Sequence, residues 1–248
     1  MVQLSVNVNK VATLRNSRGG DYPSVLDAVR TCVAAGARGI TVHPRGDERH
    51  IRRSDVREIA ALLAQLDPAV EFNIEGDPRA DWIALVNETR PTQATLVPVR
   101  PGETTSEAGW SERTDLGSMR EIVLQLKAAG ARISMFVDPE LAPIAWAKDV
   151  GADRVELYTE PFARAFAQSA AAGRESFDRY ARAAEEAHRL GLGVNAGHDL
   201  DLNNLIAFRQ LPHLDEVSIG HALIGRALFA GLSTVVREYL DCLRRRDR

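Results

Sequence analysis

The stretch Val25–His43, VLDAVRTCVAAGARGITVH, joins a helical pattern to a strand pattern through a single glycine. Its first part carries apolar residues at the i, i+3, i+4, i+7 spacing of one buried helix face, namely Val25, Ala28, Val29, Cys32 and Val33. Gly36 stands where the helix must end, because glycine tolerates the left-handed backbone of a helix C-cap. The apolar, β-branched run after it predicts a strand.

The same helix-to-strand joint recurs along the chain. It returns as Ala129-Gly130-Ala131-Arg132 and as Val150-Gly151-Ala152-Asp153, and Gly191 holds a similar place. Strands that alternate with helices in this rhythm run parallel, because each helix returns the chain to the same end of the sheet. The pattern predicts eight strands: Leu4–Val8, Gly39–His43, Glu71–Glu75, Ala94–Val99, Arg132–Asp138, Arg154–Thr159, Gly193–Gly197 and Glu216–Gly220.

Eight strand–helix units close a barrel, and the 248 residues match the about 250 of one (β/α)₈ barrel. An open doubly wound sheet is the alternative. It requires a glycine-rich turn after the first strand, where the chain reads Asn7-Val8-Asn9-Lys10. We therefore predict an α/β fold with a single (β/α)₈ TIM barrel domain over residues 1–248. Residues 100–115 are predicted to form a lid loop, and residues 160–177 an extra helix.

Composition limits the classes of partner. The net charge of −3 gives no support for a nucleic-acid partner, and no apolar run approaches the about 20 residues that span a bilayer. The amino terminus lacks the pattern of a signal peptide. Cys32 and Cys242 lie in apolar helical patterns, which favour buried thiols in a reducing compartment. We expect a cytoplasmic protein with neither nucleic-acid nor membrane partners.

Ionisable and polar residues gather at the carboxyl ends of the predicted strands. In a (β/α)₈ barrel these ends form one rim, which carries the catalytic groups. The residues are Asn7, Asn9, Lys10, His43, Arg45, Glu75, Glu156, His198, Gly220 and His221. Burying charged groups there is costly unless they have partners or a task. The pattern therefore points to an active site at this rim.

The residue types at the rim indicate proton transfer. His43, His198 and His221 follow three different strands, and histidine titrates near neutral pH. Glu75 and Glu156 are strand carboxylates, whose pKa should rise if they are desolvated at the barrel mouth. Such a carboxylate can accept a proton from carbon or oxygen. A salt bridge to Arg132 or Arg154 is the structural alternative.

Two loops have the features of phosphate-binding loops. Gly197-His198-Asp199 and Gly220-His221-Ala222 follow the seventh and eighth strands, where barrels commonly bind phosphate through backbone N–H groups and a helix amino terminus. Arg49 is expected to face solvent. A second anion site is predicted across the rim, from Arg18, Arg45 and His50.

Several longer motifs occur in order along the chain. They are VNVNKVATLRNSRG at residues 6–19, GITVH at 39–43, RHI at 49–51, LVP at 96–98, VNAGH at 194–198 and IGHALIGR at 219–226. In these motifs the chain resembles the pyridoxine 5′-phosphate synthase family over nearly its whole length. It departs from the commonest family pattern at Asn9-Lys10, where Asp-His is frequent, at Pro44 and Gly46, and at Asp199, where the family has glycine.

The resemblance implies a reaction between small phosphorylated substrates. 1-Deoxy-D-xylulose 5-phosphate and 3-amino-2-oxopropyl phosphate condense to pyridoxine 5′-phosphate, with release of phosphate and water. It also implies acid/base catalysis without metal or organic cofactor, extra helices on the barrel, and a homo-octamer. These expectations fit the rim, because repeated proton shuttling needs several titratable groups around one pocket.

The resemblance also implies residue roles. His43 and Glu75 would be the acid/base residues, His198 the proton donor, and Glu156 would stabilise charge in the transition state. The aminoketone phosphate would be held by Asn7, Arg18, Asp199, Gly220 and His221. The pentulose phosphate would be held by Asn9, Lys10, Arg45, His50 and Thr105, the last within the predicted lid.

Three other functions remain open from the residues alone. A metal-dependent sugar-phosphate epimerase or isomerase would use His43, Glu75, Glu156 and His198 as ligands. An aldolase would form a Schiff base on Lys10. A barrel that only binds phosphorylated metabolites would need the same anion loops. Proton-transfer groups at so many strand ends exceed what binding alone requires.

Overall fold

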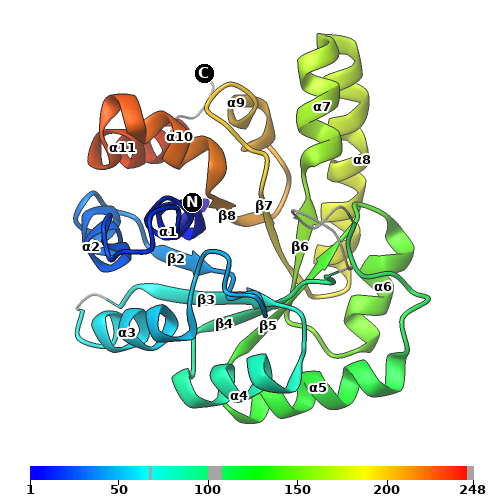
Figure 1. Ribbon diagram of the computed structural model, residues 1–248. Coiled ribbons are helices and arrows are strands. Elements are labelled where there is room, and N and C mark those ends of the chain that lie inside the picture. The colour runs from blue at the N-terminus through cyan, green and yellow to red at the C-terminus, as the bar shows by residue number, and fades with distance from the viewer. Residues whose placement is uncertain (67–68, 100–107, 245–248) are drawn as a thin grey trace.

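The computed structural model describes residues 1–66, 69–99 and 108–244, and in these residues eight parallel strands close into one barrel in the order β1 to β8 (Figure 1). This confirms the predicted (β/α)₈ fold. The predicted bounds differ most at β4, which ends at Leu96 rather than at residue 99. The strands are β1 (Gln3–Asn7), β2 (Gly39–Val42), β3 (Glu71–Gly76), β4 (Gln93–Leu96), β5 (Arg132–Val137), β6 (Arg154–Tyr158), β7 (Gly193–Gly197) and β8 (Leu214–Ile219).

Helices surround the barrel and follow the strands in sequence (Figure 1). The helix predicted within residues 160–177 is present as α7, which packs along α8 and extends with it beyond the barrel in Figure 1. The helices are α1 (Asn9–Asn16), α2 (Val25–Ala34), α3 (Arg53–Leu63), α4 (Ala80–Thr89), α5 (Leu116–Ala128), α6 (Leu141–Asp149), α7 (Glu160–Gln168), α8 (Ala170–Arg189), α9 (Leu205–Phe208), α10 (His221–Ala230) and α11 (Leu232–Arg244).

The glycine joints have the backbone that the sequence predicts. Gly36, Gly130, Gly151 and Gly191 have φ angles of 107°, 95°, 91° and 73°, which lie in the left-handed region. A side chain is strained in that region, whereas glycine adopts it freely. The joints therefore end α2, α5, α6 and α8 and turn the chain into the next strand.

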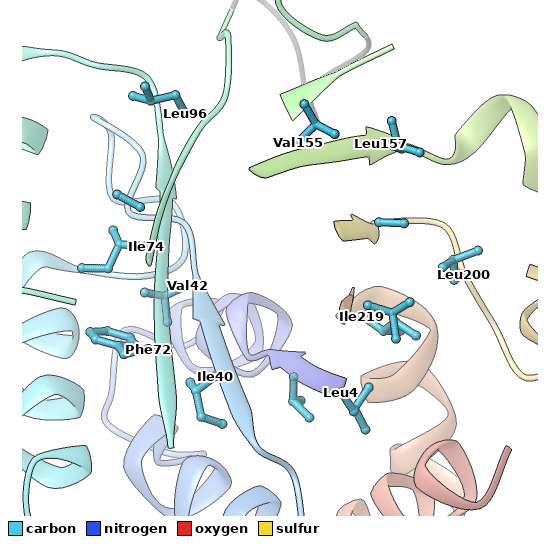
Figure 2. Packing of buried hydrophobic residues seen from close by; sticks show 14 of the residues in the cluster. Leu4, Ile40, Val42, Phe72, Ile74, Leu96, Val155, Leu157, Leu200 and Ile219 are labelled. Atoms are coloured by element: carbon cyan, nitrogen blue, oxygen red, sulfur yellow. The ribbon is translucent and has the colours of Figure 1, made fainter. Parts of the chain in front are cut away.

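The main hydrophobic core lies between the strands and the surrounding helices. One set of alternate strand residues points outward into it, including Leu4, Ile40, Ile74 and Ile219 (Figure 2). Side chains alternate between the two faces of a strand, so the other set points into the barrel. The thiol of Cys32 lies in this core, and burial raises its pKa to about 12, whereas Cys242 is only partly buried.

The inside of the barrel is polar. The amide of Asn195 on β7 donates a hydrogen bond of 3.4 Å to the side chain of Gln93 on β4, and this bond crosses the interior because these strands are not neighbours. Arg132 donates to Gln93 and to Glu71 in the same layer. Most (β/α)₈ barrels fill this space with branched apolar side chains. Here the buried polar residues on the strands are Ser5, Thr41, Asn73, Gln93, Thr95, Ser134, Glu156, Asn195, Glu216 and Ser218.

Two further sequence expectations concern the surface. Within the described part of the chain, no helix has the length and apolar character that crossing a bilayer requires. Of the predicted lid, residues 100–107 lie outside the described residues. Trp110, in the remaining part, bridges to Val137 and donates its ring N–H to the carbonyl of Leu96 at 2.9 Å. The lid therefore stays a prediction.

A buried ion pair joins the first and third helices below the rim. Both terminal nitrogens of Arg15 bind the carboxylate of Asp55, at 2.5 and 2.9 Å, and Arg15 also donates to the carbonyl of His50. Asp55 accepts the backbone N–H of Arg52 at the start of α3. Arg15 is 4% exposed and Asp55 is 7% exposed. The pair therefore holds the loop that carries His50.

We expect Asp55→Asn to lower the free energy of unfolding by about 3–5 kcal/mol, because Arg15 would be left as a buried charge without its counterion. Urea unfolding followed by circular dichroism measures this. Arg57→Gln, which breaks an exposed ion pair on the same helix, serves as the control and should change stability little. An equally small effect of Asp55→Asn would show that the buried pair does not stabilise this region.

Candidate active site

A cavity of about 310 Å³ opens at the carboxyl ends of the strands. The structure brings together here most of the residues that the sequence analysis selects. The lining includes Asn7, Asn9, Lys10, His43, Arg45, His50, Glu75, Glu156, His198, Gly220 and His221. It also includes residues that the sequence analysis does not select or places toward solvent, namely Thr13, Arg49, Val97, Phe136 and Ser218.

Three selected residues are not part of this lining. Arg18 lies in the exposed segment after α1. Asp199 lies beside the cavity, where its carboxylate contacts His198. Thr105 falls outside the described residues. Arg49 is 43% exposed at its side chain and pairs with Asp47, so it lies at the mouth, partly facing solvent as expected.

His43 and Glu75 form the largely buried centre of the site, with side chains that are 10% and 12% exposed. The Nδ1 atom of His43 lies 3.7 Å from the Oε2 atom of Glu75. The side-chain N–H of Asn7 donates to the same carboxylate oxygen at 3.4 Å. The side-chain oxygen of Asn7 accepts the backbone N–H of Asn9 at 3.0 Å. The Asn9 side chain in turn accepts the backbone N–H of His43 at 3.0 Å. The ends of β1, β2 and β3 therefore position one another's polar groups.

Burial shifts the pKa values of these groups in opposite directions. It raises the pKa of Glu75 to about 8, with a smaller contribution from the nearby carboxylate of Glu216. Burial also raises the pKa of Glu156, to which the charge of Glu75 adds. For His43, burial and then the neighbouring His50 lower the pKa to about 3. The site therefore combines neutral imidazole with carboxyl groups that can hold a proton near neutral pH.

Three buried polar atoms of the site are unsatisfied. Among the residues that the structure describes, Nε2 of His43, Oε2 of Glu156 and Oγ of Ser218 have no hydrogen-bond partner. Buried polar atoms in proteins are nearly always paired, so such atoms in a cavity are available to a substrate. The alternative, salt bridges from Glu75 or Glu156 to Arg132 or Arg154, does not match the structure. Arg132 instead pairs with Glu71, and Arg154 donates to the side chain of Asn195.

The loop after β7 presents His198 at the rim. At Gly197 a Cβ atom would lie 2.4 Å from the carbonyl oxygen of Ser218, so only glycine lets the strands approach this closely. Nδ1 of His198 lies 2.7 Å from the carboxylate of Asp199. The backbone N–H of Asp199 donates to the hydroxyl of Thr159. Asp199 is thus placed to orient the ring of His198.

A third carboxyl group, Glu216, lies in the barrel below the cavity. It accepts the amide of Asn195 at 3.3 Å and hydrogen-bonds with Glu71. Burial, and then the charge of Glu71, raise its pKa well above the usual range. Glu216 begins the predicted strand Glu216–Gly220, so the pattern of polar groups at strand ends does not include it. The signal was its spacing, since Glu216 and Ser218 share one face of β8 and Gly220 continues the alternation directly after the strand.

His221 and Gly220 lie at the amino terminus of α10, on the side of the cavity formed by β8 and β1. His221 is the first residue of this ten-residue helix, and its N-cap is Gly220. Unpaired N–H groups and the helix dipole make such a terminus favourable for an anion. Arg45, His50 and Lys10 line the cavity on the side of β1 and β2. Among the described residues, no three His, Cys, Asp or Glu side chains are arranged to share a metal ion.

Solved structures share the fold across almost the whole chain. Phosphoribosyl anthranilate isomerase from Thermus thermophilus has a TM-score of 0.59 and 16% identity, with 98% of each chain covered. Thiamine phosphate pyrophosphorylase from Pyrococcus furiosus has a TM-score of 0.62 and 14% identity, over 98% of this chain and 95% of that protein. Identities this low show the barrel fold alone.

Similarity in sequence is much closer among curated proteins. The pyridoxine 5′-phosphate synthase of Porphyromonas gingivalis is 52% identical over 244 residues, which are 98% of this chain and 99% of that protein. The protein of the same name from Leptospira biflexa is 49% identical over 98% of this chain and 97% of its own. The family model described as pyridoxal phosphate biosynthesis protein PdxJ matches residues 4–245. The chain therefore belongs to the PdxJ family.

Proposed function

We propose that this chain is a pyridoxine 5′-phosphate synthase, an enzyme of vitamin B6 biosynthesis. It condenses 1-deoxy-D-xylulose 5-phosphate with 3-amino-2-oxopropyl phosphate and releases phosphate and water. The observation that carries the proposal is the buried pair of Glu75 and His43 in a cavity that Glu156 and His198 also line. Identity of 52% to a protein of that name supports it. The same findings favour this reaction over a metal-dependent epimerase.

In the proposed mechanism, Glu75 is the general base. Its pKa is raised to about 8, so its carboxylate is a stronger base than that of an ordinary glutamate. A general base works best when its pKa lies near the pH of the reaction. His43 stays neutral and passes protons between Glu75 and the substrate, through the Nε2 atom that has no partner among the described residues. His198 donates a proton to a leaving oxygen, with its ring held by Asp199. Glu156 stabilises charge that develops in the transition state.

The two phosphate groups are proposed to bind on neighbouring sides of the cavity. The amino terminus of α10 at Gly220 and His221, together with Asn7, binds the phosphate of the aminoketone. Arg45, Lys10 and His50 bind the phosphate of the pentulose. Asn9 supports this side of the cavity, because its side chain accepts the backbone N–H of His43 directly after β2. Roles for Arg18, Asp199 and Thr105 in phosphate binding rest on the family resemblance. No cofactor is part of this proposal.

We further propose a cytoplasmic homo-oligomer. The cysteine pattern supports the location, and the family resemblance supports an octamer. Exposed apolar side chains support an assembly, since Tyr22 is 87%, Leu228 67% and Phe229 93% exposed, and a partner subunit would bury such groups. Light scattering should give a mass several times the 27.2 kDa of one chain. A monomer at micromolar concentration would contradict this expectation.

Incubation of the purified protein with both substrates should yield pyridoxine 5′-phosphate and inorganic phosphate, which mass spectrometry and a phosphate assay detect. Glu75→Gln should lower kcat by at least about 10²-fold, the usual scale for loss of a general base. The matched control is Glu185→Gln, at an exposed glutamate on α8, which should keep full activity. Near-normal turnover by Glu75→Gln would remove this residue from the mechanism, and absence of product would contradict the function.

The raised pKa of Glu75 also predicts a pH-dependent cost to stability. Below pH 4.5, the ordinary value, the carboxyl is neutral in both folded and unfolded chains. Between pH 4.5 and about 8 the unfolded chain loses the proton while the folded chain retains it, so the folded state loses stability as pH rises. Glu75→Gln removes this effect.

Urea unfolding at two pH values tests this expectation. Glu75→Gln should be more stable than wild type at pH 8.5, and the difference should shrink markedly at pH 5. An advantage of the variant that is independent of pH would show that the pKa of Glu75 is not raised in the folded protein.

A further inference from the structure

One part of the cavity wall differs in character from the rest of the barrel interior. The inward positions of the described strands carry polar side chains or glycine, with an exception at the ends of β4, β5 and β6. There Val97, Phe136 and Tyr158 form a small cluster that is separate from the main hydrophobic core. The rings of Phe136 and Tyr158 lie 5.4 Å apart. We call these three residues the apolar wall.

The apolar wall adjoins the acid/base groups. Phe136 pairs with Glu156 in the register of β5 and β6, so their side chains stand side by side on the inward face. Tyr158 lies two residues beyond Glu156 on the same face, with its ring 6.5 Å from that of His198. Val97 and Phe136 both line the cavity. These two residues of the wall are therefore part of the cavity that would hold a substrate.

Little of the apolar wall reaches the open space. Val97 and Phe136 are each 4% exposed and Tyr158 is 8% exposed. An area this small suits a single small apolar group rather than a whole ring. Everything else in this cavity favours phosphates, hydroxyls and protons, so the wall must contact the least polar part of a substrate.

The closed barrel fixes where the apolar wall lies relative to the helix terminus. The strands follow one another from β1 to β8 around the ring, so β4 and β5 stand diametrically across from β8 and β1. Gly220 and His221 follow β8, and Asn7 ends β1. A substrate whose phosphate lies at the amino terminus of α10 therefore points its opposite end at Val97 and Phe136.

The product has this shape. In pyridoxine 5′-phosphate, the ring carbon with the phosphorylated side arm and the ring carbon with the methyl group are para to each other. That methyl group comes from the terminal carbon of the 1-deoxy sugar. We infer that the apolar wall binds this methyl group and thereby selects the 1-deoxy sugar phosphate over the analogue with a hydroxyl on the same carbon, D-xylulose 5-phosphate. This inference rests on the proposed function.

The expected selectivity follows from the cost of burying a hydroxyl without a partner. The side chains of Val97 and Phe136, the two members of the apolar wall that line the cavity, offer an incoming hydroxyl group no hydrogen-bond donor or acceptor. Apolar pockets reject analogues that add one hydroxyl by roughly 10²-fold in kcat/KM. Wild-type protein should therefore prefer the 1-deoxy sugar by about that factor.

The test replaces Val97 by threonine, which keeps the shape of the side chain and adds a hydroxyl. Steady-state kcat/KM is measured with each sugar at a saturating concentration of the aminoketone. In Val97→Thr the preference for the 1-deoxy sugar should fall by about 10-fold, within the range for a single polar contact in such a pocket. Phe136→Tyr adds a hydroxyl from the neighbouring strand and should act in the same direction.

Val97→Ala is the matched control, because it shortens the side chain without adding a polar atom. It should lower kcat/KM for both sugars while the preference is retained. An equal loss for both sugars in Val97→Thr and Phe136→Tyr, or no preference in wild type, would overturn the inference and leave the proposed function intact. Failure of wild-type protein to make product from the 1-deoxy sugar would instead contradict the function itself.

Discussion

Closure of a parallel sheet is the constraint on which this protein depends. In a closed barrel each strand has one face toward the helices and one toward the interior, and residues alternate between them. The outward set supplies the apolar core, with Leu4, Ile40 and Ile219 among its members. The inward residues do not pack against the helices, so they need not be apolar. That freedom allows an interior with hydrogen bonds such as that from Asn195 to Gln93.

A polar interior costs free energy of folding, and much of this cost falls at the candidate active site. Carboxyl groups from β3, β6 and β8 lie close enough for their charges to interact, and burial raises the pKa of each. Replacing buried polar groups by apolar ones often stabilises a protein. Retaining Glu75 and Glu156 at the cavity is thus understandable if protons must move between them and a substrate. The large outer core offsets this cost.

Two residues that depart from the commonest family pattern, Asn9 and Asp199, contact histidines of the cavity. The side-chain carbonyl of Asn9 accepts the backbone N–H of His43, directly after β2. The carboxylate of Asp199 contacts the ring of His198. Both side chains therefore position histidines of the cavity.

The sequence by itself determined the order of strands and helices, the glycine joints and the rim. Each depends on local spacing, on backbone preference or on the rule that parallel strands end together. Figure 1 shows the barrel that follows from them. Reading strand ends also selected most residues of the cavity. Val97 and Phe136 escape notice because an apolar residue at a strand end looks like any core residue, and Glu216 because it begins the predicted eighth strand rather than ending it.

Only the tertiary structure decided which groups meet and how deeply they are buried. Closure of the sheet sets the distance from His43 to Glu75 and places β4 and β5 across from β8 and β1. It also leaves three polar atoms of the site without a partner among the described residues. Closure brings together residues that local sequence spacing does not relate. Burial of a charge likewise depends on the whole surrounding shell, which no single segment contains.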